Sequence, residues 1–282
     1  MLPDVGALLA LVSSVSWGVA DFVGGLAARR AGTAQVLSVS YPTGAILLTF
    51  LATFVIKGDL TAQVIPYAIA AGIIGGTAMW LLYAALTRGP MGIVSPITAV
   101  MSGLVPVLVG VGRGESLTAL AILGMGGAAV AVFLVSRESG HPHERTPMAA
   151  LLYAVASGVA IGLYLVSLGL SPASAGIWTA TLGRWITSIG MILIVAVFIR
   201  RVPARGFPWR LAMSAGVLDA MANGVFQLAS QRGLLAIVSV IGSLYPAATV
   251  LLARFILHER MNRVQVSGVV VALVAVVALT LG

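Results

Sequence analysis

Apolar stretches of about 20 residues recur along the whole chain, separated by short interruptions, and no other feature constrains the fold as strongly. A helix of that length, rising 1.5 Å per residue, crosses a hydrocarbon core of roughly 30 Å. We therefore predict an all-α, polytopic membrane protein with ten transmembrane helices. The ten stretches cover residues 3–27, 34–56, 63–86, 91–112, 117–136, 148–169, 175–199, 208–230, 235–257 and 264–281.

The composition agrees with a membrane protein and excludes a soluble one. Apolar residues make up 60% of the chain and charged residues 9%, against roughly 45–50% and about 25% in soluble domains. With so few charged side chains, most of the surface must face an apolar solvent, so the lipid bilayer is a partner. The sequence has no cysteine, which excludes disulfides, iron–sulfur clusters and thiolate zinc sites. We expect no metal and no cofactor.

The basic residues indicate how the chain lies in the membrane. The net charge is +8, but most of the Arg residues lie between the apolar stretches rather than along one face, so we expect no nucleic-acid partner. Eleven of them lie in the odd-numbered connections between spans, and only Lys57, Arg113 and Arg232 lie in the even-numbered ones. Because basic connections stay in the cytoplasm, this count predicts that both termini are periplasmic.

The second half of the chain repeats the first. Each half contains five spans, an odd number, so the two copies must lie in opposite orientations. We predict a first five-helix repeat at 1–140 and a second, inverted one at 141–282. A gapless shift of 144 residues superimposes identical residues, among them Gly18 and Gly162, Gly72 and Gly216, Arg88-Gly89 and Arg232-Gly233, Ile93-Val94-Ser95 and Ile237-Val238-Ser239, and Glu115 and Glu259.

Each half closes on a similar pattern of Pro, Glu and Gly. The second half has Leu244-Tyr245-Pro246, then Glu259-Arg260, then Gly268, and the first half has Pro106, Glu115 and Gly124. In this pattern, and in its ten spans and two repeats, the chain resembles the EamA family of drug/metabolite transporters. The resemblance implies a bacterial inner-membrane carrier, monomeric or weakly associated, with a central cavity, often an exporter of amino acids or other small metabolites. The Trp- and Tyr-rich spans are most similar to those of aromatic amino acid exporters.

Glu115 and Glu259 themselves have a structural interpretation. Each follows one span and precedes the next. A carboxylate near a helix start interacts favourably with the exposed N–H groups there, by about 0.3–1 kcal/mol. We favour this helix-start role, and direct contact with the substrate is the alternative.

Polar side chains at bilayer depth require an explanation, because a charge at the centre of a transmembrane helix costs about 2.5–3.5 kcal/mol on insertion scales. Asp219, Asn223 and Gln227 follow one another at four-residue intervals in the eighth span and form a polar stripe on one helix face. Such a stripe lines either a water-filled cavity that binds the substrate or a contact with another helix.

Two further charges lie within spans. Arg184, near the centre of the seventh span, has Asp219 as the nearest counter-charge in depth. Either the two form a structural ion pair, or Arg184 binds the carboxylate of an amino acid and Asp219 its amine. Asp21 shares a helix face with Trp17 in the first span, as part of a cavity or gate or as an interhelical hydrogen-bond partner. If transport is coupled to protons, Asp21 or Asp219 is the expected proton carrier; a facilitated carrier needs neither to titrate.

Aromatic side chains lie within the spans as well. Deep rings accompanied by a few polar groups suit a ligand pocket, and helix packing is the alternative. Tyr41 and Trp178 also lie in spans, but we do not assign them to the site. The aromatic residues predicted to bind substrate, together with the polar residues above, are Trp17, Trp80, Tyr83, Tyr164, Trp185 and Tyr245.

Prolines inside spans are candidates for moving parts. Pro96 in the fourth span and Pro246 in the ninth each remove a backbone hydrogen bond, which commonly kinks a helix. These two spans correspond under the repeat, so we predict that both prolines form gates. Packing alone is the alternative.

Together these features predict a secondary transporter that exports small-molecule metabolites, with aromatic or hydrophobic amino acids favoured, by alternating access around a central cavity. Another small metabolite or a drug is the alternative within this class, and a channel is the alternative from a different class. An enzyme is not expected, because His141, His143 and His258 lie in connections and no metalloprotease-type or paired-Asp motif occurs.

Overall fold

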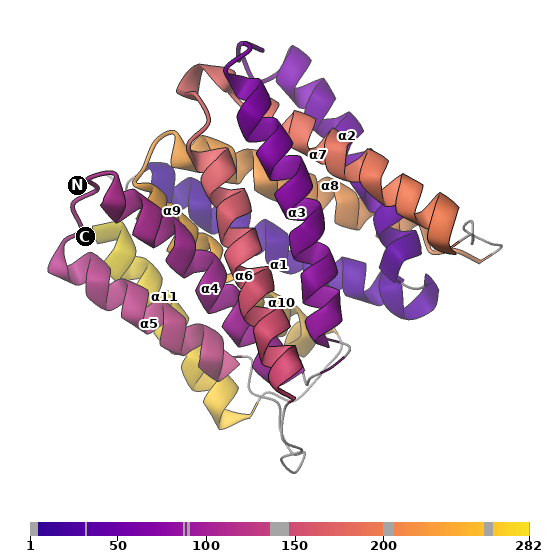
Figure 1. The fold of residues 1–282 in the computed structure, drawn as a ribbon. Coiled ribbons are helices and arrows are strands. Elements are labelled where there is room, and N and C mark those ends of the chain that lie inside the picture. The colour runs from indigo at the N-terminus through magenta and orange to yellow at the C-terminus, as the bar shows by residue number, and fades with distance from the viewer. Residues whose placement is uncertain are drawn as a thin grey trace.

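The structure, a computed structural model, describes residues 5–31, 33–86, 88, 91–135, 147–199, 206–256 and 262–281, and the regular structure within these ranges is entirely helical (Figure 1). The α-helices are α1 (Val5–Ala31), α2 (Thr33–Phe54), α3 (Val64–Leu86), α4 (Met91–Gly112), α5 (Ala119–Val135), α6 (Met148–Gly169), α7 (Trp178–Ile194), α8 (Trp209–Ser230), α9 (Leu235–Gly242), α10 (Tyr245–Ile256) and α11 (Arg263–Leu281). A 3-10 turn, Ala173–Ala175, precedes α7, and a π-helical turn, Val195–Ile199, follows it.

Six helices in the described ranges are long and apolar enough to cross a membrane, namely α1, α2, α3, α6, α7 and α11. Shorter apolar helical segments cover Ile97–Gly112, Ala119–Val135 and Leu235–Thr249. The fold is therefore that of a polytopic membrane protein, and the exact number of ten crossings remains a prediction. The helix α8, which is not among these six, carries the polar stripe, and it packs mainly against α1 and α2. A helix that neighbours shield from lipid can carry polar side chains at lower cost.

The ninth predicted span is broken into two helices. The helix α9 ends at Gly242, Ser243 and Leu244 form a turn, and α10 begins at Tyr245. In a continuous helix, Pro246 would lack the N–H that binds the Gly242 carbonyl and its ring would clash with that carbonyl, so the chain breaks just before it. The helix α4, in contrast, continues through Pro96. Of these two prolines, Pro246 therefore follows a break and Pro96 does not. The side chain of Pro96 lies outside the described part, and the gate role of both prolines remains a prediction.

The helix pairs follow the sequence repeat. Under the 144-residue shift, α1, α2 and α3 correspond to α6, α7 and α8, α4 corresponds to α9 with α10, and α5 corresponds to α11. The extensive α1–α8 contact is matched by α6–α3, and α2–α8 is matched by α7–α3. Three elements pack on their own counterparts: α2 on α7, α4 on α9, and α5 on α11, the last pair lying side by side at one edge of the bundle (Figure 1). The two halves thus share one core.

Two hydrogen bonds show the repeat at atomic detail. The Ser13 hydroxyl on α1 donates to the Ala222 carbonyl on α8, at 2.8 Å. The Ser157 hydroxyl on α6 donates to the Ala78 carbonyl on α3, at 3.0 Å. Each donor and each acceptor is displaced from its counterpart by the same 144 positions. The sequence repeat is therefore also a structural repeat, while its predicted boundary at 140/141 lies outside the described residues.

Close backbone approach holds α2 against α8. The Ser40 hydroxyl donates to the Ala212 carbonyl at 2.7 Å, and a Cβ placed at Gly216 would overlap the Ser40 carbonyl oxygen. At the matching position of the other half, a Cβ on Gly72 would lie 2.9 Å from the Gly183 carbonyl oxygen. Small residues of this kind let transmembrane helices approach closely enough for extensive van der Waals contact.

We therefore expect Gly216→Ala to destabilise the protein by about 1–3 kcal/mol, because the added methyl group forces α2 and α8 apart. The thermal midpoint of the detergent-solubilised protein measures this effect. Gly126→Ala is the matched control, since a Cβ there meets nothing within 4 Å. The control should leave stability unchanged or raise it by up to about 1 kcal/mol. Equal midpoints for the two variants would contradict the close α2–α8 contact.

Candidate functional site

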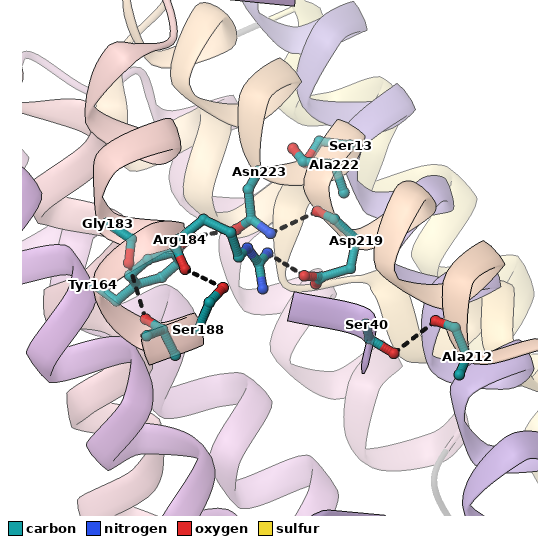
Figure 2. A network of polar contacts seen from close by, with 11 residues as sticks. Ser13, Ser40, Tyr164, Gly183, Arg184, Ser188, Ala212, Asp219, Ala222 and Asn223 are labelled. Atoms are coloured by element: carbon teal, nitrogen blue, oxygen red, sulfur yellow. Dashed lines mark hydrogen bonds and ion pairs between the residues drawn. The ribbon is translucent and has the colours of Figure 1, made fainter. Parts of the chain in front are cut away.

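Arg184 on α7 and Asp219 on α8 form an ion pair and a hydrogen bond through one guanidinium nitrogen and one carboxylate oxygen (Figure 2). The Arg184 side chain is 9% exposed and the Asp219 side chain is 31% exposed. Of the two interpretations of these residues, the structure contains the ion pair. In this conformation one guanidinium nitrogen of Arg184 and one carboxylate oxygen of Asp219 are engaged with each other.

Aromatic and amide side chains surround this pair. The ring of Tyr41, on α2, lies over the Arg184 guanidinium, 4.8 Å from it, in a cation–π arrangement. The Tyr164 hydroxyl on α6 donates to Asn223 Oδ1 at 2.6 Å, and Asn223 Nδ2 donates to the Asp219 carbonyl oxygen at 2.6 Å. The predicted residues Tyr164, Arg184, Asp219 and Asn223 thus meet in one network (Figure 2). It joins α2, α6, α7 and α8.

Asp21 adds a second carboxylate from α1. Its side chain is exposed, yet it lies close enough to Asp219, Tyr41 and Tyr245 to interact with them electrostatically. Residues of three helices besides α1 therefore lie within electrostatic range of Asp21. We call Asp21, Tyr41, Tyr164, Arg184, Asp219, Asn223 and Tyr245 the polar cluster.

Trp17 lies one helical turn before Asp21. Its ring packs at a tilt against the fully buried Phe226, with 5.5 Å between ring centroids. A Cβ at Gly242, the last residue of α9, would lie 3.3 Å from this ring. Trp17 therefore connects the polar cluster to the break between α9 and α10.

Gln227, on the same stripe of α8, lies outside the polar cluster and makes the contact with another helix that sequence analysis gave as the alternative. It is fully buried. Its Oε1 accepts the Ala180 N–H in the first turn of α7 at 2.9 Å, and its Nε2 donates to the Ser171 hydroxyl at 3.4 Å. Since the first N–H groups of a helix have no partner within it, Gln227 completes the start of α7.

The predicted aromatic residues divide into two groups. Tyr164, Tyr245 and Trp17 lie at the polar cluster, whereas Trp80 and Trp185 do not. Trp80 is 63% exposed and packs edge-on against Tyr153. Trp185 Nε1 donates to the Thr49 hydroxyl at 2.9 Å, which ties α7 to α2. The structure therefore does not bring Trp80 and Trp185 to the polar cluster, and the side chain of Tyr83 lies outside the described part.

Tyr41 is the residue of the polar cluster that sequence analysis did not assign to it. The 144-residue shift places Tyr41 on Trp185 and its neighbour Ser40 on Arg184. An aromatic ring thus occupies the same place in both repeats, but only the ring in the first half contacts the arginine of the second. The signal for Tyr41 was the repeat itself. Aligning the two halves places Tyr41 directly after the position that corresponds to Arg184.

A small cavity lies elsewhere in the bundle. It has a volume of about 110 Å³ and lies between α4, α5 and α9, where apolar residues line most of it together with Gly103 and Ser243. No residue of the polar cluster lines it. The residues predicted to bind substrate therefore lie outside this cavity.

The model of the EamA-like transporter family matches residues 4–137 and again residues 148–281. The chain belongs to this family. The two matched segments of the EamA-like protein begin 144 positions apart, which agrees with the repeat seen in its sequence and its hydrogen bonds. The family consists of transporters, so this membership agrees with a membrane protein that carries small molecules and with a protein that is not an enzyme.

Similarity to solved structures supports the fold of the EamA-like protein. One crystal structure superimposes with a TM-score of 0.78 over 98% of this chain and 96% of the other, at 16% sequence identity. Identity at this level shows a shared fold and no more. A search of curated proteins gives no significant match.

Glu115, part of the family resemblance, completes a helix start, but in the other repeat. Its two carboxylate oxygens accept the N–H groups of Leu235 and Ala236, at 2.9 and 3.0 Å, in the first turn of α9. Sequence analysis expected a helix-start role for it next to its own helix, and the structure shows that the helix it serves lies 120 residues further along the chain. Glu259 lies outside the described residues. Since both Glu115 oxygens are occupied, this carboxylate connects the repeats.

We expect Arg184→Gln and Asp219→Asn each to lower stability by about 3 kcal/mol, because each leaves one charge without its partner. Breaking a fully buried pair costs about 3–5 kcal/mol. We expect the lower end of this range because water reaches the partly exposed Asp219 side chain. The double variant should lose clearly less than the sum of the two, because it leaves no unpaired charge. Thermal midpoints of the four proteins in one detergent give the coupling, and additive losses would show that the pair makes no contribution of its own.

Proposed function

We propose that this EamA-like protein is a secondary transporter of the bacterial inner membrane that exports small metabolites by alternating access, with aromatic or hydrophobic amino acids as the leading substrate class. The observation that carries this proposal is the polar cluster itself. Charged side chains are costly at membrane depth and mark substrate or ion pathways when they occur there. Here Asp21 and Asp219 remain accessible among aromatic rings from both repeats.

The arrangement of the helices supports movement around this cluster. Transporters of this kind bind their substrates between inverted repeats, beside helices that are broken within the membrane. In this chain the polar cluster takes residues from both repeats, and Tyr245 of the cluster is the first residue of α10, directly after the break. A small change in the angle between α9 and α10 would therefore move a residue of the site.

Hydrogen bonds join three connections between helices in this conformation. The Asp59 N–H donates to the Ser174 carbonyl at 2.7 Å, and Trp178 Nε1 donates to the Gly58 carbonyl at 3.2 Å. Gln231 Nε2 donates to the Gly176 carbonyl at 2.8 Å. These bonds join connections that the count of basic residues predicts to be periplasmic. They support a resting state that is closed toward the periplasm, and a transport cycle would have to break them.

Reconstitution in liposomes tests the function. We expect saturable flux of phenylalanine, tyrosine or tryptophan, measured with and without a pH gradient. The double variant Arg184→Gln with Asp219→Asn should reduce the flux at least tenfold, because it removes both charges of the central pair while leaving no unpaired charge to destabilise the fold. A thermal midpoint near that of the unaltered protein is the control for folding.

Two results would contradict the proposal. Flux that rises linearly with concentration and carries ionic current would indicate a channel. Unchanged transport kinetics in the folded double variant would remove the Arg184–Asp219 pair from the transport site. Flux with the pH gradient that exceeds flux without it would assign proton coupling, and equal flux would assign facilitated transport.

A further inference from the structure

The charges of the polar cluster do not balance. Arg184 is the one cation among the described side chains of the cluster, and Asp219 already neutralises it. The second carboxylate, Asp21, makes no hydrogen bond or ion pair with any residue in the described ranges, although its side chain is exposed toward the cluster. With both carboxylates ionised, the cluster carries one uncompensated negative charge.

Two tyrosines whose hydroxyls have no partner among the described residues lie within electrostatic range of that charge. Tyr41 is only 7% exposed, interacts electrostatically with Asp21 and Asp219, and its hydroxyl makes no hydrogen bond within the described part of the chain. Tyr245, at the start of α10, interacts electrostatically with Asp21, and its hydroxyl is likewise unpaired among those residues. Among the described side chains, the Ser239 hydroxyl is the one that is fully buried without a partner, so the hydroxyls of Tyr41 and Tyr245 remain reachable and free to hydrogen-bond a ligand.

The helices that carry these groups pack together, since α1 contacts both α2 and α10 and a Cβ at Gly18, one turn before Asp21, would lie 2.8 Å from the Tyr245 carbonyl oxygen. Asp21 and the two hydroxyls thus offer a ligand three polar groups from three neighbouring helices.

Aromatic faces accompany these groups. Trp17 lies one turn from Asp21 on the same helix and is only half-buried. The Tyr41 ring already shows that a cation is bound by an aromatic face in this cluster, since it lies 4.8 Å from the Arg184 guanidinium. Organic cations gain about 0.5–2 kcal/mol from such faces. A carboxylate ligand would instead meet the charge of Asp21 and find Arg184 already occupied.

We propose that Asp21, together with the hydroxyls of Tyr41 and Tyr245 and the ring of Trp17, binds the protonated amine of the transported molecule. This inference deepens the proposed function and rests on it. The substrate class is a primary ammonium compound with an aromatic or apolar body, recognised by its amine and not by a carboxylate. Asp21 replaces Asp219 as the group that receives the amine, because Asp219 is engaged by Arg184.

A metal cation fits these groups less well than an ammonium. One carboxylate and two hydroxyls supply few of the six to eight oxygen ligands that Ca²⁺ takes, and Mg²⁺ requires a near-octahedral shell. An ammonium needs only three acceptors, arranged around it, and gains from the aromatic faces as well. The number and kind of the unpaired groups therefore favour the organic cation.

A charge series on the purified full-length protein tests this inference. The probes are phenylethylamine, phenylalanine methyl ester, phenylalanine and 3-phenylpropionate, which share a ring and differ in charge, and sodium chloride is a further probe. We expect the two ammonium compounds to raise the thermal midpoint and to bind at least tenfold more tightly than 3-phenylpropionate. Ligands that bind the folded state raise its stability according to their affinity. Tighter binding of 3-phenylpropionate, no binding of either ammonium compound, or equal stabilisation by sodium would overturn the proposal.

Variants locate the binding point. Asp21→Asn should weaken phenylethylamine binding at least tenfold, and Tyr41→Phe, which keeps the ring and removes the hydroxyl, should weaken it three- to tenfold. Asp59→Asn is the matched control, because the backbone of Asp59 makes its contact with Ser174 and its carboxylate does not. Unchanged affinity in folded Asp21→Asn would overturn the assignment. If that variant does not fold, the charge series and Tyr41→Phe still decide the question.

Binding and transport separate the two proposals. Tight, Asp21-dependent binding of phenylethylamine without flux in liposomes would leave this inference intact and contradict the transport function. Saturable flux of phenylethylamine that Asp21→Asn does not change, and that 3-phenylpropionate matches in rate, would support the transport function and contradict the role of Asp21.

Discussion

Burying a guanidinium and a carboxylate inside a membrane protein dictates much of what surrounds them. Arg184 and Asp219 tolerate their depth because each neutralises the other and because the Tyr41 ring lies over the guanidinium. Such a pair needs helices that hold it away from lipid, and α8 has α1 and α2 packed against it. The covering helices then bring Asp21 and Tyr41 to the same place. The same helix packing that shields the ion pair from lipid therefore also assembles the polar cluster.

The inverted repeat supplies the framework and not the chemistry. The bonds Ser13–Ala222 and Ser157–Ala78 are equivalent, and so are the helix pairs that they join. The charges are not equivalent, because Asp219 corresponds to Gly75 and Arg184 to Ser40. Duplication thus produced two similar scaffolds facing one another, and substitution in the second half, together with Asp21 in the first, gave the centre of the bundle its polarity.

Sequence reasoning predicted what depends on local pattern or on depth. The apolar stretches indicated the helices, the 144-residue shift indicated the repeat, and the charges of Arg184 and Asp219 at similar depth indicated that they could pair. It could not tell which neighbour each helix face meets. Gln227 lies on the predicted face of α8, but it meets the start of α7, and Trp185, next to Arg184, faces Thr49. Nor could it separate Pro246, where the chain breaks, from Pro96, through which α4 continues, since both are prolines within apolar stretches and only the surrounding packing distinguishes them.

The shared core has a consequence for how the protein is made. The Ser13–Ala222 hydrogen bond closes a loop of 209 residues, so α1 leaves the translocation machinery long before its main partner, α8, has been synthesised. During that interval Asp21 and the other polar groups of α1 are without the helices that cover them in the finished protein. The helices of the first half therefore enter the bilayer before they can make their native contacts. Those contacts form only after the helices of the second half have been inserted and have packed against them.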